Sequence, residues 1–193
     1  MIFGNASGVI GKNIKMINII KYFFVGICFI ANVFSAEIQT ILSAEDSFAG
    51  WKVAHRLKMT PEKEALKLHD MQADSSIVKK VEIDPDSVKA IQITYRASGI
   101  PEKTSGEIYF ANSLGDFSDA RKWTIPSLQG DGKWHTLLLT YQNLARVKEW
   151  TNGGIVTKIR LDMVNSAGGE IEISKVVLLK NIISQKNEKA KIF

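Results

Sequence analysis

Residues 91–97 read IQITYRA, and apolar and polar side chains alternate along them. The odd-numbered positions are apolar, whereas Gln92, Thr94 and Arg96 occupy the even-numbered ones. A period of two is that of a β-strand, because successive side chains point to opposite faces of a sheet. The segment therefore predicts a strand with one face on a hydrophobic core and the other face turned outward.

Four further segments have strand-like composition: residues 107–111, 134–141, 155–164 and 171–179. Residues 134–141 (WHTLLLTY) are apolar in both phases, which predicts a central strand and a core position for Trp134. In the last segment the apolar phase shifts between Ile173 and Val176, which predicts a β-bulge. Five strands are thus expected from residue 91 onward.

Turn-forming clusters separate these segments, for example the sequence NGG at residues 152–154. The first third of the chain is less regular. Residues 48–59 and 65–73 are predicted to supply two or three more strands, and residues 61–65 a short helix. Short strands between turn clusters predict one all-β sandwich or barrel over residues 37–180.

Residues 1–36 are predicted to be a signal peptide or an N-terminal anchor. Lys21 precedes the apolar run YFFVGICFIA at residues 22–31, and small residues follow it. This order is typical of a secretory signal peptide, and the run is shorter than the roughly 20 apolar residues of a membrane span. We expect a secreted, periplasmic or cell-surface protein that contacts a membrane only if the leader stays uncleaved. Residues 181–193 form a basic C-terminal tail.

Charge and cysteine content exclude two classes of site. The chain carries 25 Lys and Arg residues and 20 Asp and Glu residues. Three of the Lys residues lie in the acid-free leader, which leaves 22 basic against 20 acidic side chains, a net charge of +2. No basic cluster marks a nucleic-acid partner. Cys28, the only cysteine, lies in the leader, so residues 37–193 hold no disulfide or thiolate site.

The second half of the chain contains a set of motifs with a family resemblance. They are DGKWHT at residues 131–136, Trp150, IRLD at residues 159–162 and GGEIEI at residues 168–173. In this order and spacing they resemble galactose-binding-like jelly-roll domains, which are carbohydrate-binding-module-like β-sandwiches. The resemblance implies an all-β jelly-roll β-sandwich of about eight antiparallel strands. It also implies a glycan or polysaccharide as the ligand.

Domains of this family often hold a structural calcium ion. Ser174 stands in the last predicted strand where such domains often have an Asp. Glu45, Asp46 and Glu172 are the remaining candidate oxygen ligands, since calcium prefers carboxylate and carbonyl oxygens.

Aromatic side chains are the candidates for stacking on sugar rings. Trp51, Tyr109 and Trp123 are predicted to bind ligand, because Tyr109 lies opposite the apolar phase of its strand and the two Trp residues flank loops. A buried structural position is the alternative for each of them. Trp150 is expected in the core, because large aromatics dominate core packing.

Arg96, Arg160 and Asp162 are the predicted polar ligand contacts. If residues 91–97 and 155–164 are neighbouring strands, their polar phases bring these three side chains onto one sheet surface. Guanidinium and carboxylate groups suit sugar hydroxyls or acidic sugars. The alternative is a solvated sheet face with weak cross-strand ion pairs.

Signals for catalysis are few. The spacing of His55, His69 and His135 matches no metal or catalytic motif. The sequence therefore predicts a non-catalytic carbohydrate-binding module. A structural or protein-interaction β-sandwich is the main alternative, and a jelly-roll lyase using His135 near Tyr141 is a weaker one.

The leader is expected to be removed on export, because a basic residue, a short apolar run and small residues occur in the order that signal peptidase requires. N-terminal sequencing of the exported protein should begin at Ala36 or Glu37. Recovery of the full-length chain in membranes would instead identify an anchor.

Overall fold

The computed structural model describes residues 38–180. The predicted leader and the predicted basic tail lie outside the described residues. No helix within the described range is long and apolar enough to cross a membrane.

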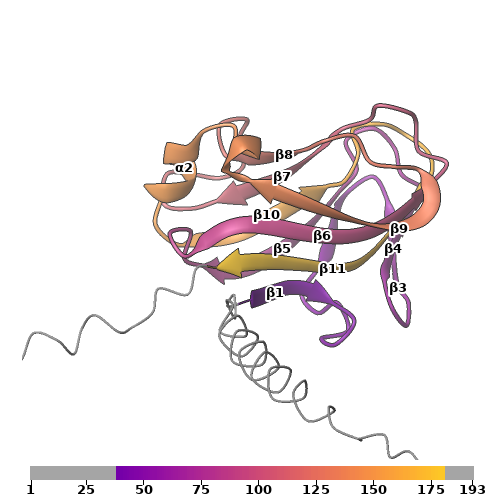
Figure 1. Cartoon of the computed structure of the whole chain (residues 1–193), viewed down its shortest axis with the longest axis horizontal. Coiled ribbons are helices and arrows are strands. Elements are labelled where there is room, and N and C mark those ends of the chain that lie inside the picture. The colour runs from indigo at the N-terminus through magenta and orange to yellow at the C-terminus, as the bar shows by residue number, and fades with distance from the viewer. Residues whose placement is uncertain (1–37, 181–193) are drawn as a thin grey trace, which may run out of the picture. The chain divides into compact units, whose positions relative to one another are not determined.

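One layer of the domain is a six-stranded antiparallel sheet with the order β3-β4-β11-β6-β9, in which β1 also pairs with β11 (Figure 1). Its strands are β1 (Ile38–Ser43), β3 (Lys58–Pro61), β4 (Leu66–His69), β6 (Val88–Ser98), β9 (Asp131–Thr140) and β11 (Glu170–Lys180). The register shifts between Ile173 and Lys175, which confirms the predicted bulge.

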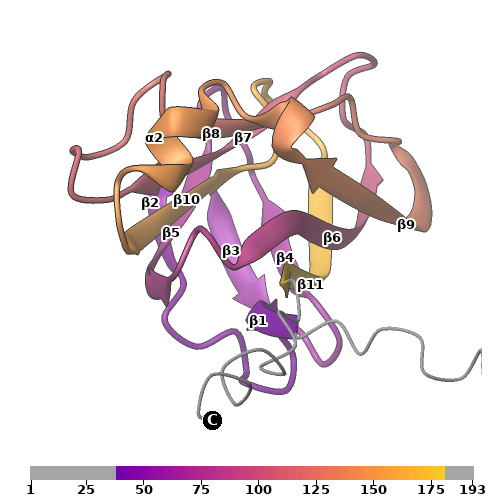
Figure 2. The ribbon, with the colours of Figure 1, turned by 60° about the vertical axis from the view of Figure 1, so that its left-hand side comes forward.

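The second layer is a five-stranded antiparallel sheet with the order β2-β5-β10-β7-β8, seen with the first in Figure 2. Its strands are β2 (Lys52–His55), β5 (Ser76–Ile83), β7 (Gly106–Ala111), β8 (Lys122–Ile125) and β10 (Val156–Asp162). A 3-10 helix, η1 (Tyr141–Asn143), and a short helix, α2 (Val147–Thr151), connect β9 to β10.

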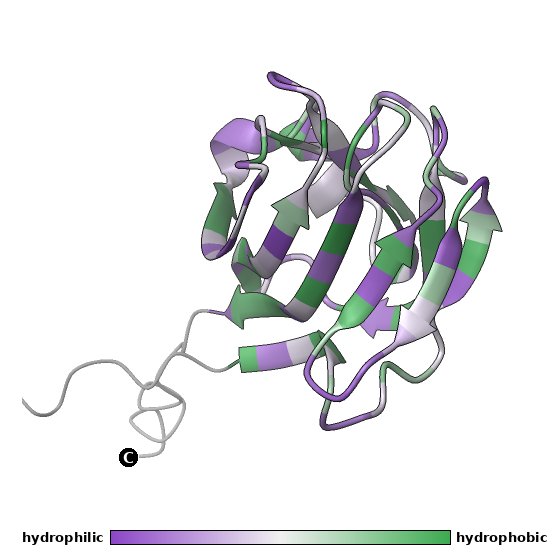
Figure 3. Ribbon diagram, turned by 90° about the vertical axis from the view of Figure 1, so that its right-hand side faces the viewer, coloured by the Kyte–Doolittle hydropathy of each residue, from purple (hydrophilic) through white to green (hydrophobic). Residues whose placement is uncertain are grey.

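The core lies between the two sheets and is built from the inward phase of each strand. Ile91, Ile93 and Tyr95 of β6 are buried, as the alternation in residues 91–97 predicts. Ile159 and Leu161 of β10 meet them from the other sheet as members of the same core cluster. Figure 3 shows hydropathy alternating along the strands. Because apolar side chains of both layers are removed from water together, neither sheet is stable alone.

All five strands predicted from residue 91 onward are present, and the jelly-roll β-sandwich is confirmed. The described residues form eleven strands instead of about eight, since short edge strands such as β2 and β8 escape a search for periodicity. The helix predicted over residues 61–65 is wrong. Pro61 ends β3, and the Glu62 N–H donates to the Ala65 carbonyl across a tight turn into β4.

The position of β9 also differs from the prediction. It pairs only with β6 and forms an edge of the six-stranded sheet. Trp134, predicted to be buried, is 41% exposed on the outer face. Because residues 134–141 are apolar in both phases, the sequence pattern did not reveal that Trp134 faces outward. Thr136 and Thr140 share the phase of Trp134, and they mark this phase as the more polar of the two.

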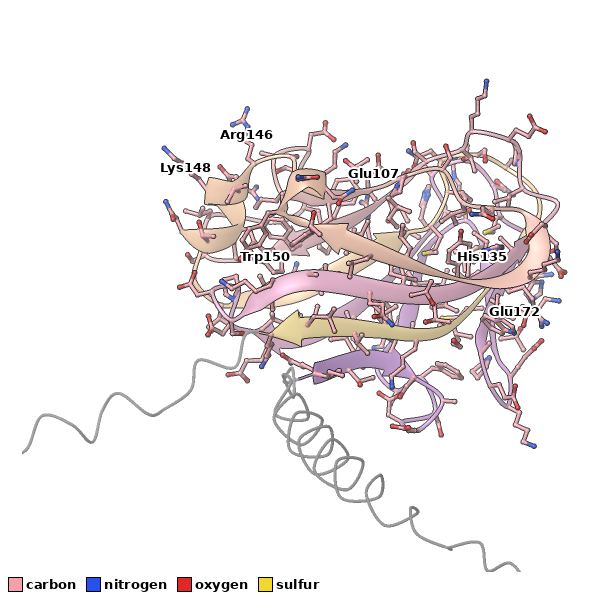
Figure 4. The ribbon with its side chains drawn as sticks, in the orientation of Figure 1. Glu107, His135, Arg146, Lys148, Trp150 and Glu172 are labelled. Carbon is pink, nitrogen blue, oxygen red and sulfur yellow. The ribbon has the colours of Figure 1, made fainter. Side chains whose placement is uncertain are left out.

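Trp150 closes one end of the core, as predicted. It points from α2 into the interior (Figure 4) and makes edge-to-face contacts with Phe110 and Trp123, with ring centroids 4.9 and 5.2 Å apart. Its indole N–H donates to the Pro85 carbonyl at 3.1 Å. Trp150 therefore links α2 to the five-stranded sheet through packing and to the turn between β5 and β6 through one buried hydrogen bond.

Replacing Trp150 with alanine should lower the free energy of unfolding by about 3–5 kcal/mol, because it opens a cavity and removes the hydrogen bond to Pro85. Urea denaturation measures this loss. Val147→Ala in the same helix is the control, since Val147 is exposed and its truncation should change stability by less than about 0.5 kcal/mol. Equal stability of the two variants would contradict the core role of Trp150.

Candidate functional site

The predicted polar site divides between two surfaces. Arg96 lies on β6 of the six-stranded sheet, whereas Arg160 and Asp162 lie on β10 of the five-stranded sheet. The prediction that residues 91–97 and 155–164 are neighbouring strands is wrong. Their matching polar phases have another cause, because each strand turns its polar phase to the outside of its own layer. Each outer face is therefore a separate candidate.

The first surface is called the Arg160 face and consists of Tyr109, Phe117, Lys122, Arg160 and Asp162. Antiparallel register places Arg160 opposite Tyr109, and Tyr109 opposite Lys122, in one row across β10, β7 and β8. Phe117 comes from the loop between β7 and β8. Cross-strand neighbours on one face are close enough to interact directly, so the sheet itself assembles this group.

Arg160 lies over two aromatic rings. Its Cζ is 4.2 Å from the centre of the Tyr109 ring and 5.6 Å from that of Phe117. The two rings meet edge-to-face at 6.5 Å, and the Lys122 ammonium lies 5.5 Å from the Tyr109 ring. Cations over aromatic faces are attracted by the ring quadrupole, which holds the guanidinium in place.

Asp162 holds the Arg160 guanidinium through two hydrogen bonds. Arg160 Nε and Nη2 donate to the two carboxylate oxygens of Asp162 at 3.0 and 2.8 Å. The Asp162 side chain is only 3% exposed, and burial raises its pKa from 3.8 to about 6, against the opposing effect of the Arg160 hydrogen bonds. Gly106 permits this packing, because a Cβ there would lie 2.3 Å from the Asp162 carbonyl oxygen.

Further charged groups surround the Arg160 face. Glu107 lies 3.6 Å from the Lys122 ammonium and accepts a hydrogen bond from the Asn165 amide at 3.2 Å. Lys158 binds the exposed carboxylate of Asp116 at 2.8 Å, and hydrogen bonding by Lys158 lowers the pKa of that carboxyl. The surface thus offers paired donors and acceptors beside half-buried aromatic rings.

The second surface is called the Trp134 hollow and lies on the outside of the six-stranded sheet. It has a volume of about 210 Å³. It is lined by Glu62, Lys63, Glu64, Ala65, Arg96, Trp134 and Glu172. Figure 4 shows Glu172 toward the end of β11 that lies away from α2.

Two of the predicted stacking residues are buried. Trp51 is 5% exposed, and its indole N–H donates to the Ile41 carbonyl at 3.0 Å. Trp123 is 0% exposed and pairs with Ile108 on the inward phase of β8. The predictions that Trp51 and Trp123 bind ligand are therefore wrong. A position near a loop does not determine whether a side chain points into the core or out to solvent. Tyr109 is half-buried and belongs to the Arg160 face.

The predicted metal ligands do not form one group. Within residues 38–180, no three Asp, Glu, His or Cys side chains are placed to hold a metal ion. Asp46 lies 3.7 Å from the Lys79 ammonium in the segment after β1, whereas Glu172 pairs with Arg96 on the outer sheet face. Glu45 is next to Asp46 but contributes no third ligand.

The proposed lyase pair is also separated. His135 Nε2 bonds the Asp131 carboxylate at 2.7 Å, and its ring packs against Tyr95. The Tyr141 hydroxyl donates to the Val88 carbonyl at 2.7 Å. Each side chain therefore serves a local structural contact, and the two share no site.

Sequence reasoning identified Tyr109, Arg160 and Asp162 but missed Phe117 and Lys122. Lys122 belongs to a four-residue strand that is too short to show a period. Phe117 lies in a polar loop, and only the fold of that loop brings it over the sheet. No sequence signal marked it.

No protein-family model and no curated protein matches this chain. Solved structures do. A variant of a carbohydrate-binding module of family 29 matches with a TM-score of 0.52 and 12% identity over 74% of this chain and 91% of that chain. A further family 29 module has a TM-score of 0.51 and 12% identity over 75% and 89%. A variant in complex with mannohexaose has a TM-score of 0.50 and 12% identity over 75% and 92%.

This likeness establishes the class of the fold. The protein is a jelly-roll β-sandwich with the fold seen in the family 29 carbohydrate-binding modules. Because a fold hosts many functions, the chemistry of the two outer faces has to carry any assignment of ligand.

The raised pKa of Asp162 makes stability depend on pH. Between pH 4 and 6 the folded protein holds a proton on Asp162 that the unfolded chain releases, so stability falls as pH rises through this window. The loss is at most about 3 kcal/mol and is complete above the folded pKa. Asp162→Asn should remove this component, as urea denaturation from pH 4 to 7 would show.

Asp119→Asn is the matched control for this titration, because the Asp119 side chain is 89% exposed. It should keep the pH profile of the unchanged protein. If Asp162→Asn also keeps that profile, Asp162 does not titrate near pH 6 in the folded state.

Proposed function

We propose that this protein is an exported, non-catalytic carbohydrate-binding module that holds a glycan or polysaccharide on the Arg160 face. The observation that carries the proposal is the stack of Arg160 on Tyr109 and Phe117 with a bidentate pair to Asp162. It places aromatic surface and paired hydrogen-bonding groups side by side on the outside of one sheet.

The chemistry of sugars fits this arrangement. A pyranose ring presents C–H groups on its faces and hydroxyls around its edge, and each hydroxyl both donates and accepts hydrogen bonds. The parts of the Tyr109 and Phe117 rings that Arg160 leaves uncovered offer apolar surface to the sugar C–H groups. Arg160 and Lys122 donate to hydroxyl oxygens, and Glu107 accepts from hydroxyl hydrogens. Ligand sites in general combine apolar surface with a few placed polar groups in this way.

Preorganisation favours binding at this face. Asp162 and the two rings already hold the Arg160 guanidinium, so ligand binding need not immobilise a free arginine side chain. Immobilising such a side chain costs about 0.5–1.5 kcal/mol, which is avoided here. A stable buried partner such as Asp162 is therefore useful to the site even though burying a carboxylate is costly.

The structural neighbours support a carbohydrate ligand. Family 29 modules are described in complexes with cellulohexaose and mannohexaose. Variants of those modules that replace a tyrosine, an arginine or an aspartate by alanine were made to probe ligand recognition. Residues of the same three types make up the centre of the Arg160 face.

Export and the lack of catalysis are parts of the same proposal. The basic residue, apolar run and small residues of the leader support export to the periplasm, the cell surface or the medium. The local roles of His135 and Tyr141 support a binding function, because neither side chain is placed beside the other for acid–base chemistry.

Isothermal titration calorimetry with cellulohexaose and mannohexaose tests the proposal. Tyr109→Ala and Arg160→Lys should each weaken binding by about 1–3 kcal/mol, because the first removes stacking area and the second the planar guanidinium. Lysine is used at position 160 because it keeps a cation beside the buried Asp162, whereas alanine would leave that carboxylate unpaired and destabilise the fold.

Lys175→Ala is the control, since Lys175 is exposed on the opposite sheet. It should bind as the unchanged protein does. If neither hexasaccharide binds at millimolar concentration and a glycan array is silent, the protein-interaction sandwich becomes the better account.

A further inference from the structure

Trp134 is exceptional among the tryptophans of this chain. All four lie within the described residues, and Trp51, Trp123 and Trp150 are at most 5% exposed. Trp134 is 41% exposed on the edge strand β9. Leaving an indole in water forgoes the burial energy that its size offers. An exposed tryptophan beside a hollow is therefore a feature that the packing of the sandwich does not explain.

The residues around Trp134 form an ordered row. Register places Lys67, Glu172, Arg96 and Trp134 opposite one another across β4, β11, β6 and β9. Arg96 forms an ion pair with Glu172, and its Cζ lies 5.0 Å from the centre of the indole. Lys67 in turn binds Glu170 at 2.8 Å. The donor and acceptor groups beside the indole are thus held in fixed positions.

The turn between β3 and β4 adds a wall to this row. Glu62, Lys63 and Glu64 of that turn line the hollow together with Arg96, Trp134 and Glu172. Its volume of about 210 Å³ is below the roughly 300–1,000 Å³ of pockets that hold drug-sized ligands. The hollow therefore has a size that suits one sugar ring of a glycan.

The charges of the hollow select among sugars. Three carboxylates, from Glu62, Glu64 and Glu172, face two cations, from Lys63 and Arg96. A surplus of carboxylates repels an acidic sugar, whereas hydroxyls can bond to both kinds of group. The ligand class that fits is a neutral pyranose unit.

We propose that the Trp134 hollow is a second carbohydrate-binding site that takes one neutral pyranose unit, with the sugar ring on the indole and its hydroxyls on Arg96, Glu172 and the β3–β4 turn. The site is independent of the Arg160 face, because the two lie on different sheets. Since each occupies the outer face of its layer, one module can hold a glycan on the Arg160 face and a pyranose unit in the Trp134 hollow at the same time.

The exposed indole provides a direct readout. In ¹⁵N NMR spectra only the Trp134 indole N–H should shift when methyl glycosides of glucose, mannose or galactose are added up to about 20 mM, well above a millimolar Kd. The N–H groups of Trp51 and Trp150 are bonded inside the fold and serve as internal references. No shift of the Trp134 signal with any of these sugars overturns the proposal.

Variants separate this site from the Arg160 face. Trp134→Ala should weaken, at least tenfold, the binding of the glycoside that shifts the Trp134 signal. Because this variant lacks the indole, its binding is measured by the shifts of the backbone amides around Arg96 and Glu172. The melting temperature should stay within about 2 °C of the unchanged protein, because the Trp134 side chain is exposed. Leu138→Ala, on the same strand and face with 52% exposure, should change neither. Tyr109→Ala should leave the Trp134 shift intact even if the Arg160 face proves not to bind sugar.

Simultaneous binding of two sugars by one protein molecule is tested by a capture experiment. The sugar that shifts Trp134 is immobilised, the protein is bound to it, and labelled cellulohexaose or mannohexaose is added. The unchanged protein should retain the label, whereas Trp134→Ala should not bind the surface. Binding of the protein to the surface without retention of a hexasaccharide that it binds in solution would show that the two faces do not act together.

Discussion

The antiparallel pairing of β6 with β11 is the interaction on which the other features depend. It runs from the pair of Ser98 with Glu170 to the pair of Val88 with Lys180 and places both strands at the centre of the six-stranded sheet. The described domain has no cysteine, so burial of the inward phase of these strands against the other sheet has to supply the stability. The same pairing turns Arg96 and Glu172 outward together and thereby forms the floor of the Trp134 hollow.

A sandwich with this register has two outer faces, and each gathers its polar side chains in rows across the strands. On the Arg160 face the buried carboxylate of Asp162, the guanidinium and two aromatic rings form one contact network. On the other face Trp134 stands at an edge where no further strand covers it. Both arrangements follow from cross-strand neighbours lying about 5 Å apart, so that one residue per strand is enough to build a site.

The burial of Asp162 illustrates how the positioning of a side chain and the stability of the fold compete. Desolvation raises the pKa of its carboxyl to about 6, so the fold carries a cost at neutral pH that an apolar residue would avoid. The gain is positional, because Asp162 holds Arg160 at a fixed place beside Tyr109. The exposed indole of Trp134 involves a similar compromise, since its surface would contribute more to stability inside the core.

The sequence by itself determined the all-β class, the five later strands, the bulge near Ser174 and the core role of Trp150, because alternation and turn residues are local signals. Only the tertiary structure decided which strands are neighbours, and hence that Arg96 and Arg160 lie on different sheets. It also decided that Trp123 is inside and Trp134 outside. A strand that is apolar in both phases carries no sign of its inner face, and pairing partners far apart in sequence are selected by the packing of the whole core.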